Sequence, residues 1–69
     1  MENQIRDLRK KKGFTQQKLA TVLGVSRQTV IAIENGRYHP SLELAFRIGR
    51  VMDLPLEEIF FYQEEEDDE

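Results

Sequence analysis

The sequence predicts an all-α fold, a compact domain of five short helices around one core. Apolar residues recur at spacings of three and four, and no stretch shows the strict alternation of a half-buried strand. One pattern typical of a helix start occurs twice: a hydroxyl residue that can cap the helix, with an apolar residue just before it and another four residues after it. Its first occurrence is Phe14, Thr15 and Leu19. With 69 residues, the chain can build only one small core.

The first two helices are expected over residues 2–12 and 16–23. Gly13 is placed to end the first helix. Thr15 can serve as the N-cap of the second helix, and Gly24 closes it.

The same capping pattern returns at once in Val25, Ser26 and Val30, which open a third helix over residues 27–34. A very tight turn therefore joins the second and third helices. The Asn35-Gly36 pair tolerates the left-handed conformation and ends the third helix.

Ser41 is the expected N-cap of a fourth helix, whose apolar face continues to Met52. Pro55 starts a short fifth helix. The candidate core residues are Ile5, Leu8, Phe14, Leu19, Ala20, Leu23, Val25, Val30, Ile33, Leu44, Ala45, Ile48, Val51, Leu56 and Ile59.

Composition excludes several classes of protein. There is no cysteine, so the fold has neither a disulfide framework nor a thiolate metal site. His39 is the only histidine and is expected to be a loop residue, so we expect no metal and no cofactor. A domain this small has little room for a catalytic cleft, and no carboxylate pair or phosphate-binding glycine loop suggests an enzyme. No apolar run is long enough to span a bilayer, and the N-terminus lacks a signal peptide, which predicts a cytoplasmic protein without membrane contact.

The charge is divided along the chain. Residues 64–69, EEEDDE, carry six negative charges, whereas residues 1–63 hold ten Lys/Arg against seven Asp/Glu, a balance of +3. We therefore expect a mildly basic domain over 1–63 and a disordered, solubilising acidic tail over 64–69. The alternative is a tail that competes with DNA for the basic face of the domain.

Two short helices joined by a tight turn match the helix-turn-helix unit, whose second helix enters the DNA major groove. At the start of the third helix, Ser26 and free backbone amides can meet a phosphate. Arg27 can pair with guanine O6 and N7, and Gln28 with adenine N6 and N7. Ala32, one turn further, can touch a thymine methyl. These residues are the base-reading candidates.

The stretch QQKLATVLGVSRQTVIAIENG resembles the helix-turn-helix of phage-repressor-like regulators of the Cro and Xre type. The resemblance covers nearly the whole chain, and IENGRYHPSLELA is similar to the family's segment after the recognition helix. It implies a lambda-repressor-like DNA-binding domain. The matching residues are Ala20, Gly24, Val25, Val30 and Ile33.

The resemblance also implies roles for single residues. Gln16 matches a phosphate-contacting glutamine, and Thr29 a position that contacts phosphate or base. Asn35 and Arg37 match DNA-backbone contacts that follow the recognition helix.

A charged pair implied by the resemblance, Arg9 with Glu34, would join the first helix to the end of the third and be structural. Two residues depart from the family's pattern. Ile31 is apolar where relatives usually carry a small or polar residue, and its neighbours in the helical period suggest an exposed or boundary position, where it could face a partner subunit. Pro55 replaces the usual polar cap before the last helix.

The C-terminal aromatics Phe60, Phe61 and Tyr62 are more than a small core can bury together with Phe14 and Phe46. Exposed apolar residues often mark an association surface, and helix-turn-helix proteins commonly bind two half-sites as symmetric dimers. We therefore expect a homodimer through the fifth helix and the segment FFYQ. The alternative is that these rings cover the core.

Together these features predict a sequence-specific, double-stranded-DNA-binding transcriptional regulator, a repressor that occupies a palindromic operator as a dimer. The alternative function is an antitoxin or adaptor whose main partner is a protein bound through the aromatic and acidic C-terminal segment.

Overall fold

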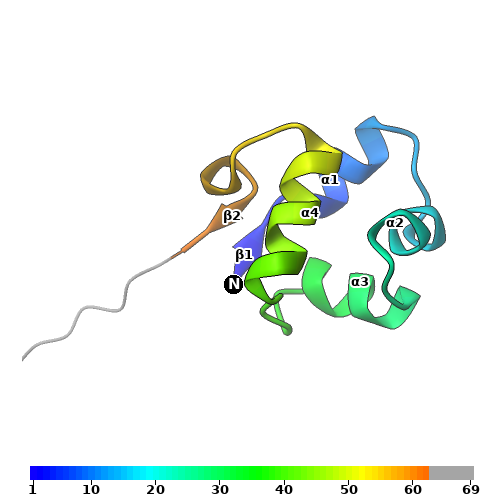
Figure 1. The fold of residues 1–69 in the computed structure, drawn as a ribbon, viewed down its shortest axis with the longest axis horizontal. Helices are drawn as coiled ribbons and strands as arrows, with labels where there is room; N and C mark the ends of the chain where they lie inside the picture. The colour runs from blue at the N-terminus through cyan, green and yellow to red at the C-terminus, as the bar shows by residue number, and fades with distance from the viewer. Residues whose placement is uncertain (63–69) are drawn as a thin grey trace, which may run out of the picture.

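The structure, a computed structural model, describes residues 1–62, so the expected acidic tail lies outside the described residues. Four helices wrap around one core, and a small sheet joins the two ends of the described chain (Figure 1). The all-α prediction is confirmed. In chain order the elements are β1 (Glu2–Asn3), α1 (Ile5–Lys11), α2 (Gln16–Leu23), α3 (Arg27–Glu34), α4 (Leu42–Met52), the 3-10 turn η1 (Leu56–Glu58) and β2 (Phe60–Phe61).

The two ends of the fold differ from the prediction. The first helix begins at Ile5 rather than at residue 2, because residues 2 and 3 are extended and pair with β2. The sheet is antiparallel, with Glu2 opposite Phe61 and Asn3 opposite Phe60. The expected fifth helix is a single 3-10 turn, because the chain turns into β2 directly after it. The expectation of no strand was wrong, since two-residue strands are too short to show alternation.

The expected N-caps are confirmed. Thr15, Ser26 and Ser41 each accept a hydrogen bond from the backbone amide three residues further on, at 2.9, 3.1 and 3.1 Å. Each residue is extended while the next begins a helix, so the hydroxyl satisfies an amide that has no intrahelical partner. The starts of α2, α3 and α4 are therefore encoded locally.

Gly24 makes the tight turn between α2 and α3. Its φ of +78° lies in the left-handed region, which strains any residue with a Cβ atom. The amides of Gly24 and Val25 both donate to the Ala20 carbonyl, at 2.8 and 3.0 Å. Only three residues, 24–26, therefore separate the end of α2 from the start of α3.

The core lies between α2, α3 and α4 and is closed by α1 and Ile59. Most of the candidate core residues are buried there, and Met52, which was not among them, is buried as well. Ala45 is only half-buried. Five candidates pack at the edge of the core and keep part of their surface exposed: Leu8, Phe14, Val25, Val51 and Leu56.

Gly49 lets α4 approach the chain that follows it. A Cβ atom at this position would lie 3.2 Å from Leu56 Cδ2 and 3.3 Å from the Leu54 carbonyl oxygen. The absence of a side chain therefore sets how closely η1 packs on α4. None of the helices in residues 1–62 is long and apolar enough to cross a membrane.

Candidate nucleic-acid interface

One side of α3 is buried and the other is available to a ligand. Val30 and Ile33, with 1% and 2% of their surface exposed, fix the helix in the core. Arg27 and Gln28, at its start, are exposed, and Ala32 is half-buried one turn further on. The base-reading candidates therefore lie on the outer side of a helix whose inner side is packed.

The start of α3 is a capped helix N-terminus. Ser26 Oγ accepts from the Thr29 amide, and the two side-chain hydroxyls lie 3.0 Å apart. The first amides of a helix have no intrahelical carbonyl, and the helix dipole favours an anion there. Ser26 and Thr29, both expected to contact the DNA backbone, thus lie together at an anion-favouring end.

A chain of side-chain contacts leads from α1 to the start of α3. Arg9 Nε donates to Glu34 Oε2 at 2.6 Å, and Gln16 Nε2 donates to Glu34 Oε1 at 3.2 Å. The other end of the Gln16 amide, Oε1, accepts from Arg27 Nη2 at 3.5 Å. The structure therefore brings the expected ion pair, a phosphate-contact candidate and a base-reading candidate into one network.

Glu34 is the centre of this network, and none of its side-chain surface is exposed. Burial raises the pKa of its carboxyl group, but hydrogen bonds from Arg9 and Gln16 outweigh burial, helped by the charges of Arg9 and Arg6. The net effect holds the Glu34 pKa below its ordinary value. The ionised carboxylate accepts the hydrogen bond from the Gln16 amide nitrogen, and this leaves the Gln16 oxygen facing Arg27.

Arg9 also organises the loop before α2. Its side chain is 9% exposed, and Nη1 donates to the Phe14 carbonyl at 2.9 Å. The same guanidinium thus joins α1, the end of α3 and the residue that precedes the Thr15 cap. Its position in the buried part of the molecule fits a structural role.

The end of α3 carries the remaining backbone-contact candidates. Asn35 is the C-cap residue, and its Oδ1 accepts from Arg6 Nη2 at 3.0 Å. Arg37 is exposed in the loop that follows. Sequence reasoning missed Arg6, whose side chain is 50% exposed beside Asn35. Its spacing of three from Arg9 places both on one face of α1 and was the available signal.

The expected dimer residues occupy a different part of the molecule. Phe60 is half-buried against the core, while Phe61 and Tyr62 are 42% and 74% exposed. In Figure 1, β2 and the start of α3 lie on opposite sides of the fold. The structure therefore separates these aromatics from the base-reading candidates.

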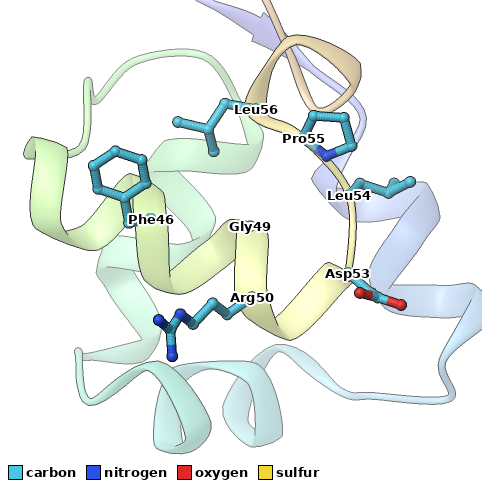
Figure 2. A pocket seen from close by; sticks show the side chains of 7 residues that line it. All are labelled: Phe46, Gly49, Arg50, Asp53, Leu54, Pro55 and Leu56. Carbon is cyan, nitrogen blue, oxygen red and sulfur yellow. The ribbon is translucent and has the colours of Figure 1, made fainter.

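A second apolar surface was not foreseen. An open groove of about 600 Å³ runs along α4 and the chain leading into η1 (Figure 2). Phe46 and Arg50 come from α4, and Leu56 comes from η1. Phe46 is 57% exposed, and Leu42, one turn earlier, is 70% exposed. The four-residue spacing of these two residues outside the core face of the fourth helix was the signal in the sequence.

Metal-binding chemistry has no support in the part of the chain that the structure describes. Residues 1–62 hold no group of three His, Cys, Asp or Glu side chains arranged for an ion. His39 is exposed in the loop between α3 and α4.

The architecture and the exposed start of α3 are those of a helix-turn-helix, and a model of the helix-turn-helix family matches residues 5–59. The chain belongs to this family. A protein of Methanocaldococcus jannaschii named an uncharacterized HTH-type transcriptional regulator is 48% identical over 66 residues, which cover 96% of this chain and 100% of the relative. YgzD of Bacillus subtilis, with the same description, is 45% identical over 65 residues, or 94% of this chain and 98% of YgzD.

Among solved structures, the restriction-modification controller protein C.AhdI from Aeromonas hydrophila is similar, with a TM-score of 0.72 and 32% identity. The similarity covers 81% of this chain and 85% of C.AhdI. This chain is therefore a transcriptional regulator with a helix-turn-helix DNA-binding domain. The family to which it belongs is not enzymatic.

Proposed function

We propose that this regulator binds a specific palindromic DNA operator as a homodimer in the cytoplasm and represses transcription by blocking polymerase. The observation that carries the proposal is the two-sided character of α3. Its inner residues are fixed in the core, and Arg27 and Gln28 are exposed at its start. Those side chains have the donors and acceptors that distinguish bases in the major groove.

The residues divide into two roles. Arg27 pairs with a guanine, Gln28 with an adenine, and Ala32 contacts a thymine methyl. Contacts to the DNA backbone position the domain without reading sequence. The backbone-contacting residues are Gln16, Ser26, Thr29, Asn35 and Arg37, with Arg6 beside Asn35.

The contact between Gln16 and Arg27 supports this division. At 3.5 Å it is weak, so DNA can replace it with a bidentate guanine contact. The weak contact places the Arg27 guanidinium beside Gln16, so a base-reading candidate and a phosphate-contact candidate are adjacent at the start of α3. The buried Glu34 carboxylate holds Gln16 in place for this contact.

Dimer formation is supported by the apolar residues at the C-terminal side of the molecule. Phe61 and Tyr62 are exposed on and after β2, and the groove beside η1 adds Phe46 and Leu56. A two-fold axis through this side leaves each α3 free to face DNA, because β2 and the start of α3 lie on opposite sides of the fold (Figure 1).

Selection from a random duplex library, followed by affinity measurement on the enriched site, tests the proposal. We expect an inverted repeat whose half-site centres lie about 34 Å apart. Arg27→Ala should lower affinity for that site about tenfold and relax preference at one base position. Sequence-indifferent binding by the wild-type protein, or an unchanged preference in Arg27→Ala, would show that α3 does not read bases as assigned.

Sedimentation tests the dimer and locates its surface. We expect a dimer at tens of micromolar, and we expect Tyr62→Lys or Phe46→Lys to dissociate it, according to which apolar surface is used. Leu42→Lys, with 70% exposure one turn before Phe46, measures how far the contact extends along α4. A monomeric wild-type protein at this concentration contradicts the proposal.

A second candidate function rests on the same exposed aromatics. Phe61 and Tyr62 also suit an antitoxin or adaptor that binds another protein through its C-terminal segment. A stable complex with one defined protein, lost on truncation after Leu54, together with no enriched DNA site, would favour this function over the operator.

A further inference from the structure

Asn3 lies where three elements meet. Its backbone pairs with Phe60 of β2 in the antiparallel sheet. Its side-chain oxygen accepts from the amide of Ile5, the first residue of α1, at 3.0 Å. Its side-chain nitrogen donates to the Ile33 carbonyl, in the last turn of α3, at 2.8 Å. One short side chain therefore connects the sheet, α1 and the recognition helix.

The bond to Ile33 differs from the other bonds at the end of α3. The Gly36 amide also donates to the Ile33 carbonyl, at 2.9 Å, but this is a local helix-ending contact. The Ile33 carbonyl oxygen has a second lone pair, which accepts the hydrogen bond from the side chain of Asn3. Asn3 lies thirty residues earlier in the chain, so this bond is a tertiary contact. The N-terminal segment makes a second bond to the chain just after α3, because the Met1 amino group donates to the Gly36 carbonyl at 2.9 Å. The N-terminal segment thus clamps the end of α3 to the sheet.

We propose that Asn3 is a positioning residue for sequence recognition: it sets the angle at which α3 presents Arg27 and Gln28 to the bases. The role rests on the proposed reading of bases by α3. The α2–α3 turn fixes the start of this eight-residue helix, and the Asn3 bond holds its end together with the buried Arg9–Glu34 pair. Without the Asn3 bond, the last turn of α3 is held less firmly against the sheet, and bidentate base contacts weaken steeply as their angles change.

Asn3→Asp separates this role from the bond that Asn3 accepts from the first amide of α1. The aspartate keeps an oxygen that accepts from the Ile5 amide, and a negative charge is favourable at a helix start. It loses the nitrogen that donates to Ile33 and sets an oxygen against that carbonyl. The variant therefore retains the bond from the Ile5 amide and loses the bond to the Ile33 carbonyl.

Gln4→Glu is the matched control. It makes the same chemical change at the next residue and adds the same negative charge, so long-range repulsion of DNA is equal. The Gln4 amide nitrogen donates to the Glu58 carbonyl in η1 and not to α3. It therefore reports what losing an N-terminal anchor does when the recognition helix is not involved.

The test compares affinity for the enriched site with affinity for random duplex, at a temperature where each variant is folded by circular dichroism. Asn3→Asp should lower the ratio of the two affinities about tenfold, with non-specific affinity equal to that of Gln4→Glu. Gln4→Glu should keep the wild-type ratio within about twofold. Equal ratios in the two variants overturn the role of Asn3. A wild-type protein without site preference overturns the proposed function as well.

Asn3→Ser keeps the test decisive if Asn3→Asp does not fold. Its hydroxyl can still accept from the Ile5 amide, but it is too short to reach the Ile33 carbonyl. We expect a lowered specificity ratio, accompanied by shifts of the backbone amide resonances along α3. Unchanged α3 resonances together with an unchanged ratio contradict the role.

Discussion

Glu34→Gln tests whether the buried network holds the fold together. The carboxylate has no exposed surface and accepts hydrogen bonds from Arg9 and Gln16. The glutamine keeps one acceptor but sets an amide nitrogen against a donor, and it leaves the Arg9 cation without its counter-charge. Removing one member of a buried pair costs about 3–5 kcal/mol. Because Arg9 keeps its bond to the Phe14 carbonyl, we expect the free energy of unfolding to fall by about 3 kcal/mol.

The pH dependence of this loss follows from the lowered pKa of Glu34. The folded state lowers that pKa below its unfolded value of about 4.3, so the stabilisation by ionised Glu34 is fully present above that pH. It is lost as pH falls through the folded pKa. The stability difference between wild type and Glu34→Gln should therefore be complete at neutral pH and shrink in acid.

Urea denaturation followed by far-UV circular dichroism measures both quantities. For a domain of this size, a loss of about 3 kcal/mol corresponds to a fall in Tm of about 15 °C. Glu43→Gln is the control, because its side chain is 77% exposed and its pair with Arg47 should contribute less than about 0.5 kcal/mol. A loss below about 1 kcal/mol in Glu34→Gln, or a difference that persists unchanged in acid, refutes the central role of the carboxylate.

Three further predictions concern the packing of α4, its cap and the phosphate contacts. Gly49→Ala should lower stability by about 1 kcal/mol in thermal melts, because the contacts of the new methyl with Leu56 Cδ2 at 3.2 Å and the Leu54 carbonyl oxygen at 3.3 Å outweigh the roughly 1 kcal/mol that alanine gains over glycine inside a helix; a stabilising effect means that η1 shifts to relieve these contacts. Ser41→Ala should lower the free energy of unfolding by about 1 kcal/mol, which appears as a lower urea midpoint at an unchanged m-value; a changed m-value would point to a different cause. Arg6→Ala should reduce the slope of log affinity against log salt by about one, whereas Arg50→Ala, in the groove beside η1, should not; equal slopes remove Arg6 from the phosphate contacts.

The parts of the fold that were predictable depend on neighbouring residues. The caps at Thr15, Ser26 and Ser41 each act on an amide three residues away, so the pattern is readable in the sequence. The turn at Gly24 is predictable for the same reason, because the left-handed conformation depends only on the residue type at that position. The helix-turn-helix and its flanking helix ends could therefore be predicted.

The parts that were missed depend on residues far apart in the chain. β1 and β2 contain two residues each, and each is extended because the other is present. The clamp by Asn3 and the contact between Arg6 and Asn35 also join segments about thirty residues apart. The groove at Phe46 arises because η1 is one turn long and leaves α4 uncovered. Local spacing could have marked Arg6 and Phe46 as exposed candidates, but it does not specify which distant segment each of them lies beside.

The pairing of the two ends of the described chain has a consequence for the order of folding. Contacts between α2 and α3 close a short loop, whereas pairing Glu2 with Phe61 closes almost the whole described chain. Loop closure of that length is slow, so the helix-turn-helix forms before the sheet. During synthesis, Phe60 and Phe61 leave the ribosome after α3, so the whole recognition helix is made before the sheet that holds β1 can form. The sheet that holds Asn3 in its place is therefore the last part of the described fold to form.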